Sequence, residues 1–235
     1  MAQGITYLKS KLASKQDRVR TRYNYYEMKD THNPRNLMVP SNLRNKFTVK
    51  LGWCTKAVDS LADRLQFRGF KNDNLDMTSI YQMNNMDILA DSAILGALIS
   101  SCDFIYISQD EEGYPRMQVI DGYNGTGIMD EITGMLEEGY AVLDRDENGN
   151  IITEAYFAKG YTDFYTVGQD PYRIENIAPY PLLVPIVNRP DAKRPFGHSR
   201  ISRSLMKYQN NVADTLINMA ICSETNAFVQ KYIVG

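Results

Sequence analysis

The chain has 235 residues, 43% of them apolar, which is enough for one large domain or two smaller domains with cores of their own and argues against disorder. The formal net charge is −2 and the pI is about 5.8, so no overall positive field would draw nucleic acid to the isolated chain. Any contact with DNA would therefore have to be local or geometric.

Helices are predicted in the first hundred residues. Apolar side chains recur at helical spacing from about residue 5 to residue 28, and a turn-rich break over residues 31–36 follows. A second helix is predicted from Cys54 to Leu65, where apolar residues repeat at three and four. Asp76 can cap a third helix, which we expect to continue to Leu98.

From Phe104 onward the apolar period changes to two, which is typical of strands. One hairpin is predicted from Phe104–Ile107 and Met117–Ile120, and a second from Tyr140–Leu143 and Ile151–Tyr156. A further strand is predicted over Tyr161–Val167. Helices followed by antiparallel hairpins indicate an α+β fold rather than a wound parallel sheet.

The segment 171–198 is crowded with prolines and therefore cannot form a helix or a central strand. We expect it to be an extended connector between an α+β domain at residues 1–170 and a C-terminal part at residues 199–235. Ser199 or Ser202 can cap the last helix, which should span about 25 residues and so roughly 40 Å, before the strand-like end of the chain.

The last helix carries two apolar stripes, and two stripes need two neighbours. The first stripe is Ile201, Leu205, Tyr208, Val212, Leu216 and Met219, and the second is Met206, Ala213, Ile217, Ala220 and Ile221. Polar residues occupy the remaining surface, which suits a hydrated lining or a polar contact between subunits. The candidates for this role are Gln209, Asn210, Asp214, Asn218 and Glu224. An ordinary surface helix with a wide core-facing side would explain the same pattern.

The three cysteines, Cys54, Cys102 and Cys222, lie far apart and form no C-x-x-C pair, so we expect buried thiols in a reducing compartment rather than disulfides. The first residues do not resemble a signal peptide. The best apolar stretch, Ala90–Ile99, is interrupted by polar residues and is too short to span a bilayer. The sequence thus predicts a soluble protein without a membrane partner.

The acidic stretch Asp144–Asn150 matches the opening of a calcium loop, with oxygen ligands at alternate positions and glycine at the sixth. The twelfth position, however, is Ala155, with Glu154 one residue early, and the flanks alternate like strands. A hairpin with an Asn-Gly turn explains the same residues. A hydrolase or calcium-binding enzyme that uses residues 144–154 remains the alternative function.

Other chemical motifs are weak. The glycine-rich segment Gly122–Gly127 does not complete a phosphate-binding pattern, and we expect it to be a connecting loop. His32 and His198 lie in loops without a second ligand at helical spacing, and no G-x-S-x-G elbow occurs. No catalytic, metal-binding or cofactor-binding residue is therefore predicted. A sequence-reading DNA binder is disfavoured, because no helix combines clustered basic residues with base-reading amides.

Five stretches carry a family resemblance in the same order along the chain. They are Arg22–Glu27 with its tyrosine pair, Trp53–Leu65 followed by Phe67–Phe70, Asn84–Asp87 before Ala97–Leu98, Val187–Pro190 with Arg194–Ile201, and Glu224–Phe228 with Lys231–Gly235. Together they resemble the portal proteins of tailed bacteriophages. The chain departs from that pattern at Glu27-Met28, where glycine is usual, and at Val229-Gln230, where Pro-Gln is common.

The resemblance covers nearly the whole chain but only about the first half of a typical portal protein. It implies that residues 1–170 are similar to the portal wing and that the last helix is similar to the first stem helix. That helix would pack beside its copies around a central channel, and the strand at Tyr232–Gly235 would enter the terminase-facing clip. We therefore expect a truncated or partial product, or a natural short form.

The resemblance also implies a ring of identical subunits, dodecameric in the family, at one capsid vertex of the virion, assembled in the host cytoplasm. Such a ring is no enzyme: it passes double-stranded DNA without sequence specificity during packaging and ejection. The implied partners are the terminase large subunit, capsid and scaffolding proteins, and head–tail connector proteins. On this hypothesis Gln209, Asn210, Asp214 and Asn218 face the channel or a neighbouring subunit.

Overall fold

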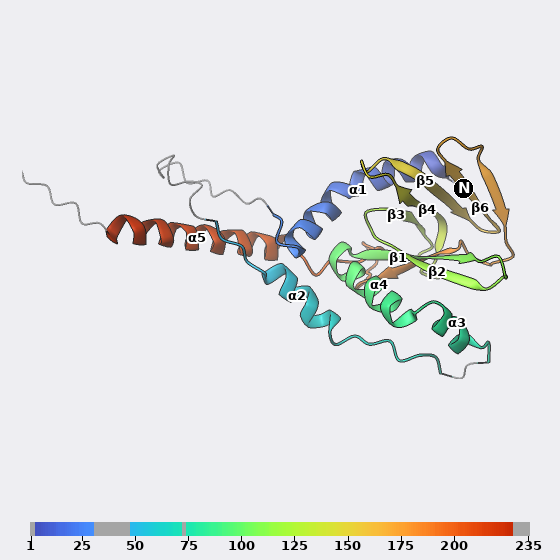
Figure 1. Ribbon diagram of the computed structural model, residues 1–235, viewed down its shortest axis with the longest axis horizontal. Coiled ribbons are helices and arrows are strands. Elements are labelled where there is room, and N and C mark those ends of the chain that lie inside the picture. Colours follow the sequence, from blue (N-terminus) through green and yellow to red (C-terminus); the bar gives the residue numbers. More distant parts are fainter. Residues whose placement is uncertain (1–2, 31–47, 72–73, 228–235) are drawn as a thin grey trace, which may run out of the picture.

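The structure is a computed structural model that describes residues 3–30, 48–71 and 74–227 (Figure 1). Its helices are α1 (Gly4–Tyr26), α2 (Trp53–Ala62), α3 (Met77–Met83), α4 (Met86–Ser100) and α5 (Arg203–Ala227). Its strands are β1 (Cys102–Gln109), β2 (Pro115–Ile120), β3 (Gly125–Met129), β4 (Leu136–Arg145), β5 (Ile151–Ala158), β6 (Tyr161–Thr166), β7 (Tyr172–Glu175) and β8 (Leu183–Val187). The α+β class predicted from the sequence is confirmed.

The first two helices form where the apolar periodicity predicts them. α1 ends at Tyr26, where the backbone N–H of Glu27 still donates to the carbonyl of Tyr23. α2 ends at Ala62, three residues earlier than predicted, and the chain continues to Leu65 as a turn. The break predicted over residues 31–36 and the histidine at position 32 lie outside the described residues.

The predicted third helix is wrong as a single element, because the chain breaks it into α3 and α4. Asn85 adopts a left-handed conformation with φ of 48°, which a continuous right-handed helix does not allow. Asp76 does precede α3, but it also has a positive φ, and its carboxylate accepts from the Ser79 hydroxyl at 2.8 Å rather than from a backbone N–H. The predicted capping contact is therefore wrong as well.

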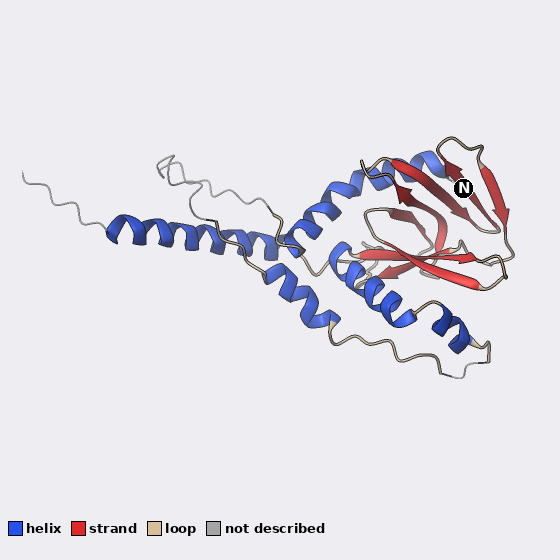
Figure 2. Cartoon of the chain, in the orientation of Figure 1, coloured by secondary structure: helices blue, strands red, loops and turns tan. Residues whose placement is uncertain are grey.

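The strands form two antiparallel sheets (Figure 2). One has three strands in the order β2-β1-β8, and the other has five in the order β3-β4-β5-β6-β7. The two predicted hairpins are confirmed as β1–β2 and β4–β5, and the predicted strand at Tyr161–Val167 is β6. Each sheet is thus built around a hairpin that the alternating pattern indicates.

The glycine-rich segment is only partly a loop, which corrects the prediction. Gly125 begins β3, which pairs with β4. A Cβ at Gly125 would lie 2.5 Å from Cδ2 of Phe104, so the missing side chain leaves room for that ring in the core. Glycine permits close packing at this position. The sequence alone does not show that a small residue is needed, because the ring that takes the space belongs to another strand.

The proline-rich segment contributes a strand to the edge of each sheet. β7 is the last strand of the five-stranded sheet, and β8 is an edge of the three-stranded sheet. Pro185 lies within β8 opposite Phe104 of β1. Proline cannot donate a ladder hydrogen bond, so an edge strand accommodates it where a central strand would not. The segment expected to be a connector therefore completes both sheets.

Two apolar layers hold the sheets and α1 together. Phe104, Phe157 and Leu183 are buried in the core that lies between the two sheets. On the opposite face of β4 and β5, Tyr140 and Tyr156 pack with Leu8, Leu12 and Val142. Side chains alternate along β4 and β5, so one face of these strands packs in the core between the sheets and the other face packs against α1.

A third apolar cluster joins α2 and α4 to the residues that lead into α5, through Val58, Leu98 and Ile201. Figure 1 shows α5 projecting away from the sheets, with α2 near its first turns. The predicted bounds of this helix are confirmed, and the Ser202 hydroxyl accepts from the backbone N–H of Leu205 at 3.1 Å. The strand predicted at Tyr232–Gly235 lies outside the described residues. Among the described residues, no helix has the length and apolarity that crossing a membrane requires.

Candidate functional site

The candidate site is α5, because its first turns are fixed to the body while the rest of the helix projects. The Ser199 hydroxyl donates to the carbonyl of Ile99 at 2.5 Å, and the backbone N–H of Arg200 donates to the carbonyl of Leu98 at 2.8 Å. Ile201 is buried in the cluster that includes Val58 of α2. These contacts set the direction in which α5 leaves the body.

Gln209 is placed inside the chain rather than on a surface. Its side chain is 2% exposed, and its Oε1 accepts from the backbone N–H of Cys54 at 3.1 Å. Cys54 is in the first turn of α2, whose preceding residue, Gly52, has no side chain to cap the helix. Gln209 therefore caps α2 from another helix, and it cannot line a channel in this arrangement.

Asn210 is also engaged within the chain. Its Nδ2 donates to the Tyr25 hydroxyl at 2.8 Å, and the same hydroxyl is 3.0 Å from its Oδ1. The neighbouring Tyr26 hydroxyl donates to Oδ1 of Asp59 at 2.9 Å. The tyrosine pair at the end of α1 thus links α1 to α5 through one residue and to α2 through the other.

The other three candidates lie further along the helix. Asn218 is exposed, whereas Asp214 and Glu224 are half-buried. Each of the three has at least one interaction partner. The structure therefore separates the predicted polar set into Gln209 and Asn210, which stabilise the base of α5, and three residues that lie beyond this base.

The two predicted apolar stripes of α5 have different surroundings. In the second stripe Ala213 and Ile217 are buried. In the first stripe Tyr208 is 65% exposed, Leu216 is 38% exposed and Met219 is 62% exposed. One stripe is thus used by the fold, and much of the other stays on the surface of a projecting helix. Exposed apolar surface of this kind is typical of interaction sites.

A cluster of buried and half-buried charged side chains lies where α1, α4 and β1 meet, and sequence reasoning missed it. The Asp103 carboxylate is 1% exposed, and its Oδ1 accepts from the Ser100 hydroxyl at 2.6 Å and from the backbone N–H of Gly122 at 2.8 Å. Nζ of Lys15 donates to the carbonyl of Gly125 at 2.5 Å. Gly96 of α4 has no Cβ, and a Cβ there would overlap the Asp103 carboxylate.

Burial governs the protonation of this cluster. It raises the pKa of Asp103 to about 7 and lowers the pKa of Lys15 to about 8, since both charged forms are removed from water. The pKa of Asp121 is also raised by burial. The only sequence signals were a polar residue in an apolar strand and a lysine on an amphipathic helix, and neither indicates a partner.

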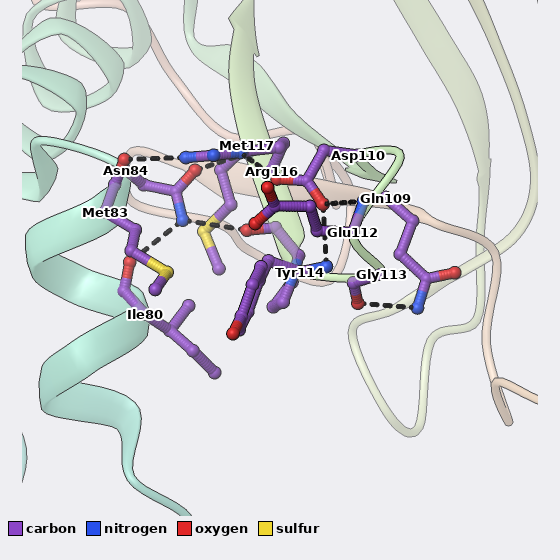
Figure 3. A network of polar contacts seen from close by, with 11 residues as sticks. Ile80, Met83, Asn84, Gln109, Asp110, Glu112, Gly113, Tyr114, Arg116 and Met117 are labelled. Atoms are coloured by element: carbon purple, nitrogen blue, oxygen red, sulfur yellow. Dashed lines mark hydrogen bonds and ion pairs between the residues drawn. The ribbon is translucent and has the colours of Figure 1, made fainter.

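A second polar network fixes the β1–β2 hairpin to the junction of α3 and α4 (Figure 3). Asn84 donates from Nδ2 to the carbonyl of Pro115 at 3.0 Å and accepts at Oδ1 from the backbone N–H of Met117 at 2.9 Å. Arg116 donates to the carbonyl of Met83 at 3.0 Å and to Asp110 at 2.8 Å. Residues beside the break in the predicted third helix therefore hold the hairpin.

The acidic loop expected for the alternative enzyme forms a hairpin turn. Oδ1 of Asp146 accepts from the backbone N–H groups of Asn148 and Asn150 at 2.9 and 2.7 Å. At the other polar loop, His198 contacts Asp191 at 2.5 Å and Arg194 at 3.3 Å. Within the described residues no group of three or more His, Cys, Asp or Glu side chains could hold a metal ion.

Comparison with known proteins adds no assignment: no protein-family model matches this chain, and no curated protein matches it.

Proposed function

We propose that this chain is a portal-type protein of a tailed bacteriophage, whose copies form a ring at one capsid vertex. The ring would conduct double-stranded DNA during packaging and ejection and would dock the terminase motor. The proposal rests on the five resembling stretches together with one structural observation. That observation is the exposed apolar stripe of Tyr208, Leu216 and Met219 on a helix that projects from the body.

A ring explains this stripe better than an isolated subunit does. A helix that is apolar on two sides needs two neighbours. In the described part of the chain, one stripe is buried at Ala213 and Ile217, whereas the other is exposed at Tyr208, Leu216 and Met219. In a closed ring each subunit presents two different surfaces, one to each neighbour. The exposed stripe of α5 would then lie against the next copy, with the remaining polar side toward the channel or solvent.

Two of the resembling stretches contact each other near the base of α5, and one of them also contacts this helix. Tyr25 and Tyr26 of the first stretch contact Asn210 and Asp59, and Asp59 belongs to the second stretch. In the fourth stretch, Nδ2 of Asn188 donates to the carbonyl of His198 at 2.6 Å. Segments far apart in the sequence thus cooperate to orient one helix, as a shared structural role would require.

The charge of the chain is compatible with a conduit. Each phosphate that a lysine or arginine neutralises releases counterions and strengthens the hold on DNA. A chain of net charge −2 has no general excess of positive charge with which to hold the DNA in this way. The proposed ring would therefore let DNA slide rather than bind it tightly.

Electron microscopy and mass photometry of the complete gene product test the proposal. We expect rings with a central hole, with a mass that corresponds to many copies. Compact single molecules at all protein concentrations would contradict it.

A pair of substitutions tests the role of the stripe. Met219→Glu places a charge on the exposed stripe, whereas Ile132→Glu places one on a surface loop where Ile132 is 94% exposed. We expect both variants to keep the melting temperature, because both side chains are largely exposed. Only Met219→Glu should prevent ring formation. Normal rings in Met219→Glu would show that α5 does not form the subunit contact through this stripe.

A further inference from the structure

A pocket opens at the edge of the two sheets, on the body and away from α5. It is formed by the end of β1, the beginning of β2, strands β6 and β7, and the segment that leads from β7 to β8. Its volume is about 620 Å³, which is in the range of sites for small molecules. The residues used below are Tyr106, Thr162, Phe164, Ile174, Glu175 and Asn176.

Two residues that line this pocket each carry a buried polar atom that has no hydrogen-bond partner. The two atoms are Oγ1 of Thr162, whose residue is 3% exposed, and Nδ2 of Asn176. Among the described residues only one other buried side-chain atom, Nε of Arg200, shares this condition. Because buried polar groups are almost always paired, two unpaired groups on residues that line one pocket point to a ligand that pairs with both.

The orientation of the Asn176 amide is set by its own loop. Its Oδ1 accepts from the backbone N–H of Ala178 at 3.1 Å, and its backbone N–H donates to the carbonyl of Gly160 at 2.8 Å. The oxygen end of the amide is therefore occupied, and the unpaired NH₂ end offers a donor. The Thr162 hydroxyl, which can both donate and accept, lies on β6 opposite Ile174 of β7.

The rest of the lining is mainly apolar, with Tyr106, Phe164 and the half-exposed Ile174 among its walls. Among the described residues, Glu175 is the one charged residue in the lining, and its charge disfavours an anionic ligand. We propose that this pocket binds an apolar group that carries a neutral amide. The amide carbonyl accepts from Nδ2 of Asn176, and the amide N–H donates to Oγ1 of Thr162. The same chemistry occurs in a free small molecule and in an apolar residue of a peptide.

This inference is independent of the proposed ring, and it can be tested on the chain itself by amide NMR. The probe is N-acetyl-L-leucinamide, titrated into isotope-labelled protein, with N-acetylglycinamide and 3-methylbutan-1-ol as controls. The first control lacks the apolar body and the second lacks the amide. We expect saturable shifts at Thr162, Phe164 and the side-chain amide of Asn176 with the full probe, and at least tenfold weaker binding of each control. Shifts without saturation, or equal binding of the controls, would overturn the proposal.

Two near-isosteric variants remove one hydrogen bond each. Thr162→Val removes the hydroxyl, and Asn176→Asp keeps the oxygen bound to Ala178 but removes the donor. Each should weaken probe binding about tenfold, since one hydrogen bond in a dry site has this effect. Thr166→Val on the same strand is the matched control and should leave binding unchanged. Unchanged binding in both pocket variants would overturn the proposal.

Two further measurements complete the test. The melting temperature of ligand-free Thr162→Val should equal or exceed that of the unchanged chain, because an unpaired buried hydroxyl is lost. A clear decrease would show that the hydroxyl already has a partner, which contradicts the proposal. The pentapeptide acetyl-Gly-Gly-Leu-Gly-Gly-amide distinguishes the two sources: at least tenfold tighter binding than N-acetyl-L-leucinamide identifies a peptide segment, and equal or weaker saturable binding identifies a free small molecule.

Discussion

Oε1 of Gln209 lies 3.1 Å from the backbone nitrogen of Cys54 and accepts its hydrogen bond, so a side chain of α5 caps the first turn of α2. The two residues are 155 positions apart in the chain. The amide pattern of α5 predicted a polar surface, but burial makes this particular amide part of the core. A helix that projects from a body has to be held at its base, and Gln209 does so with one directed contact.

Replacing Gln209 should therefore reduce stability. Gln209→Met keeps most of the volume but leaves the buried N–H of Cys54 without an acceptor, which should lower the free energy of unfolding by about 1–3 kcal/mol. Asn211→Leu, at an exposed position of the same helix, should change it by less than about 0.5 kcal/mol. Urea denaturation measures both, and equal values for the two variants would show that the capping contact contributes nothing.

The contact between Tyr25 and Asn210 should appear as coupling in a double-mutant cycle. Tyr25→Phe and Asn210→Leu each break the same pair, so their combined effect should be smaller than the sum by about 0.5–1.5 kcal/mol. Tyr26→Phe is the control, because its hydroxyl donates to Asp59 instead. Its effect should add to that of Asn210→Leu, and additivity in both cycles would refute the pairing.

Asp103 should make stability decrease as the pH rises from about 4 to about 7. Its pKa is raised to about 7 in the folded chain from an ordinary value of 3.8, so within this window the folded chain holds a proton that the unfolded chain has released. The resulting slope is up to about 1.4 kcal/mol per pH unit. The stability that Asp103 contributes is therefore fully present below its unfolded pKa of 3.8, and it is lost as the pH rises through the folded pKa of about 7.

Asp103→Asn should flatten this dependence, because the amide stays neutral and can still accept from Ser100 and Gly122. Urea denaturation at several pH values between about 4 and 7 measures the slope. A smaller slope of the same sign should remain, since burial also raises the pKa of Asp121. If the free energy of unfolding of the variant kept the same slope against pH, other groups would be the cause of the pH dependence.

Gly96→Ala should destabilise the chain, because the added Cβ would overlap the Asp103 carboxylate. Overpacking of this kind typically costs about 1–3 kcal/mol. Gly52→Ala is the matched control: its Cβ would meet only Sδ of Met28 at 3.5 Å, and its φ of −92° is open to alanine. Thermal unfolding compares the two. Similar melting temperatures would mean that α4 and β1 can separate at little cost.

The turn at Asp146 should respond to mutation but not to calcium. Asp146→Ala removes the acceptor for two backbone N–H groups and should lower the free energy of unfolding by about 1 kcal/mol. Calorimetry with calcium should show no saturable heat. A micromolar signal that disappears in Asp144→Ala would instead support the calcium-dependent alternative.

Much of the local structure followed from the sequence. The spacing of apolar residues predicted α1, α2 and α5, and alternation predicted the β1–β2 and β4–β5 hairpins, because these periods directly reflect the geometry of a helix and a strand. The break at Asn84 and Asn85 was missed, since the apolar spacing continues across it. At this break Asn85 has a positive φ, and Asn84 contacts β2, a strand more than 30 residues later.

The sequence by itself determined α1, α2, α5, β6 and the β1–β2 and β4–β5 hairpins, and that α5 has two apolar sides. Only the tertiary structure decided which of these sides is covered and that Gln209 and Asn210 hold α5 at its base. It also decided that Asp103 lies against Gly96, where the charge of Lys15 acts on it. The physical reason is that periodicity records how a side chain relates to its own backbone. Its partner, its burial and its pKa depend on segments that the fold brings from far along the chain.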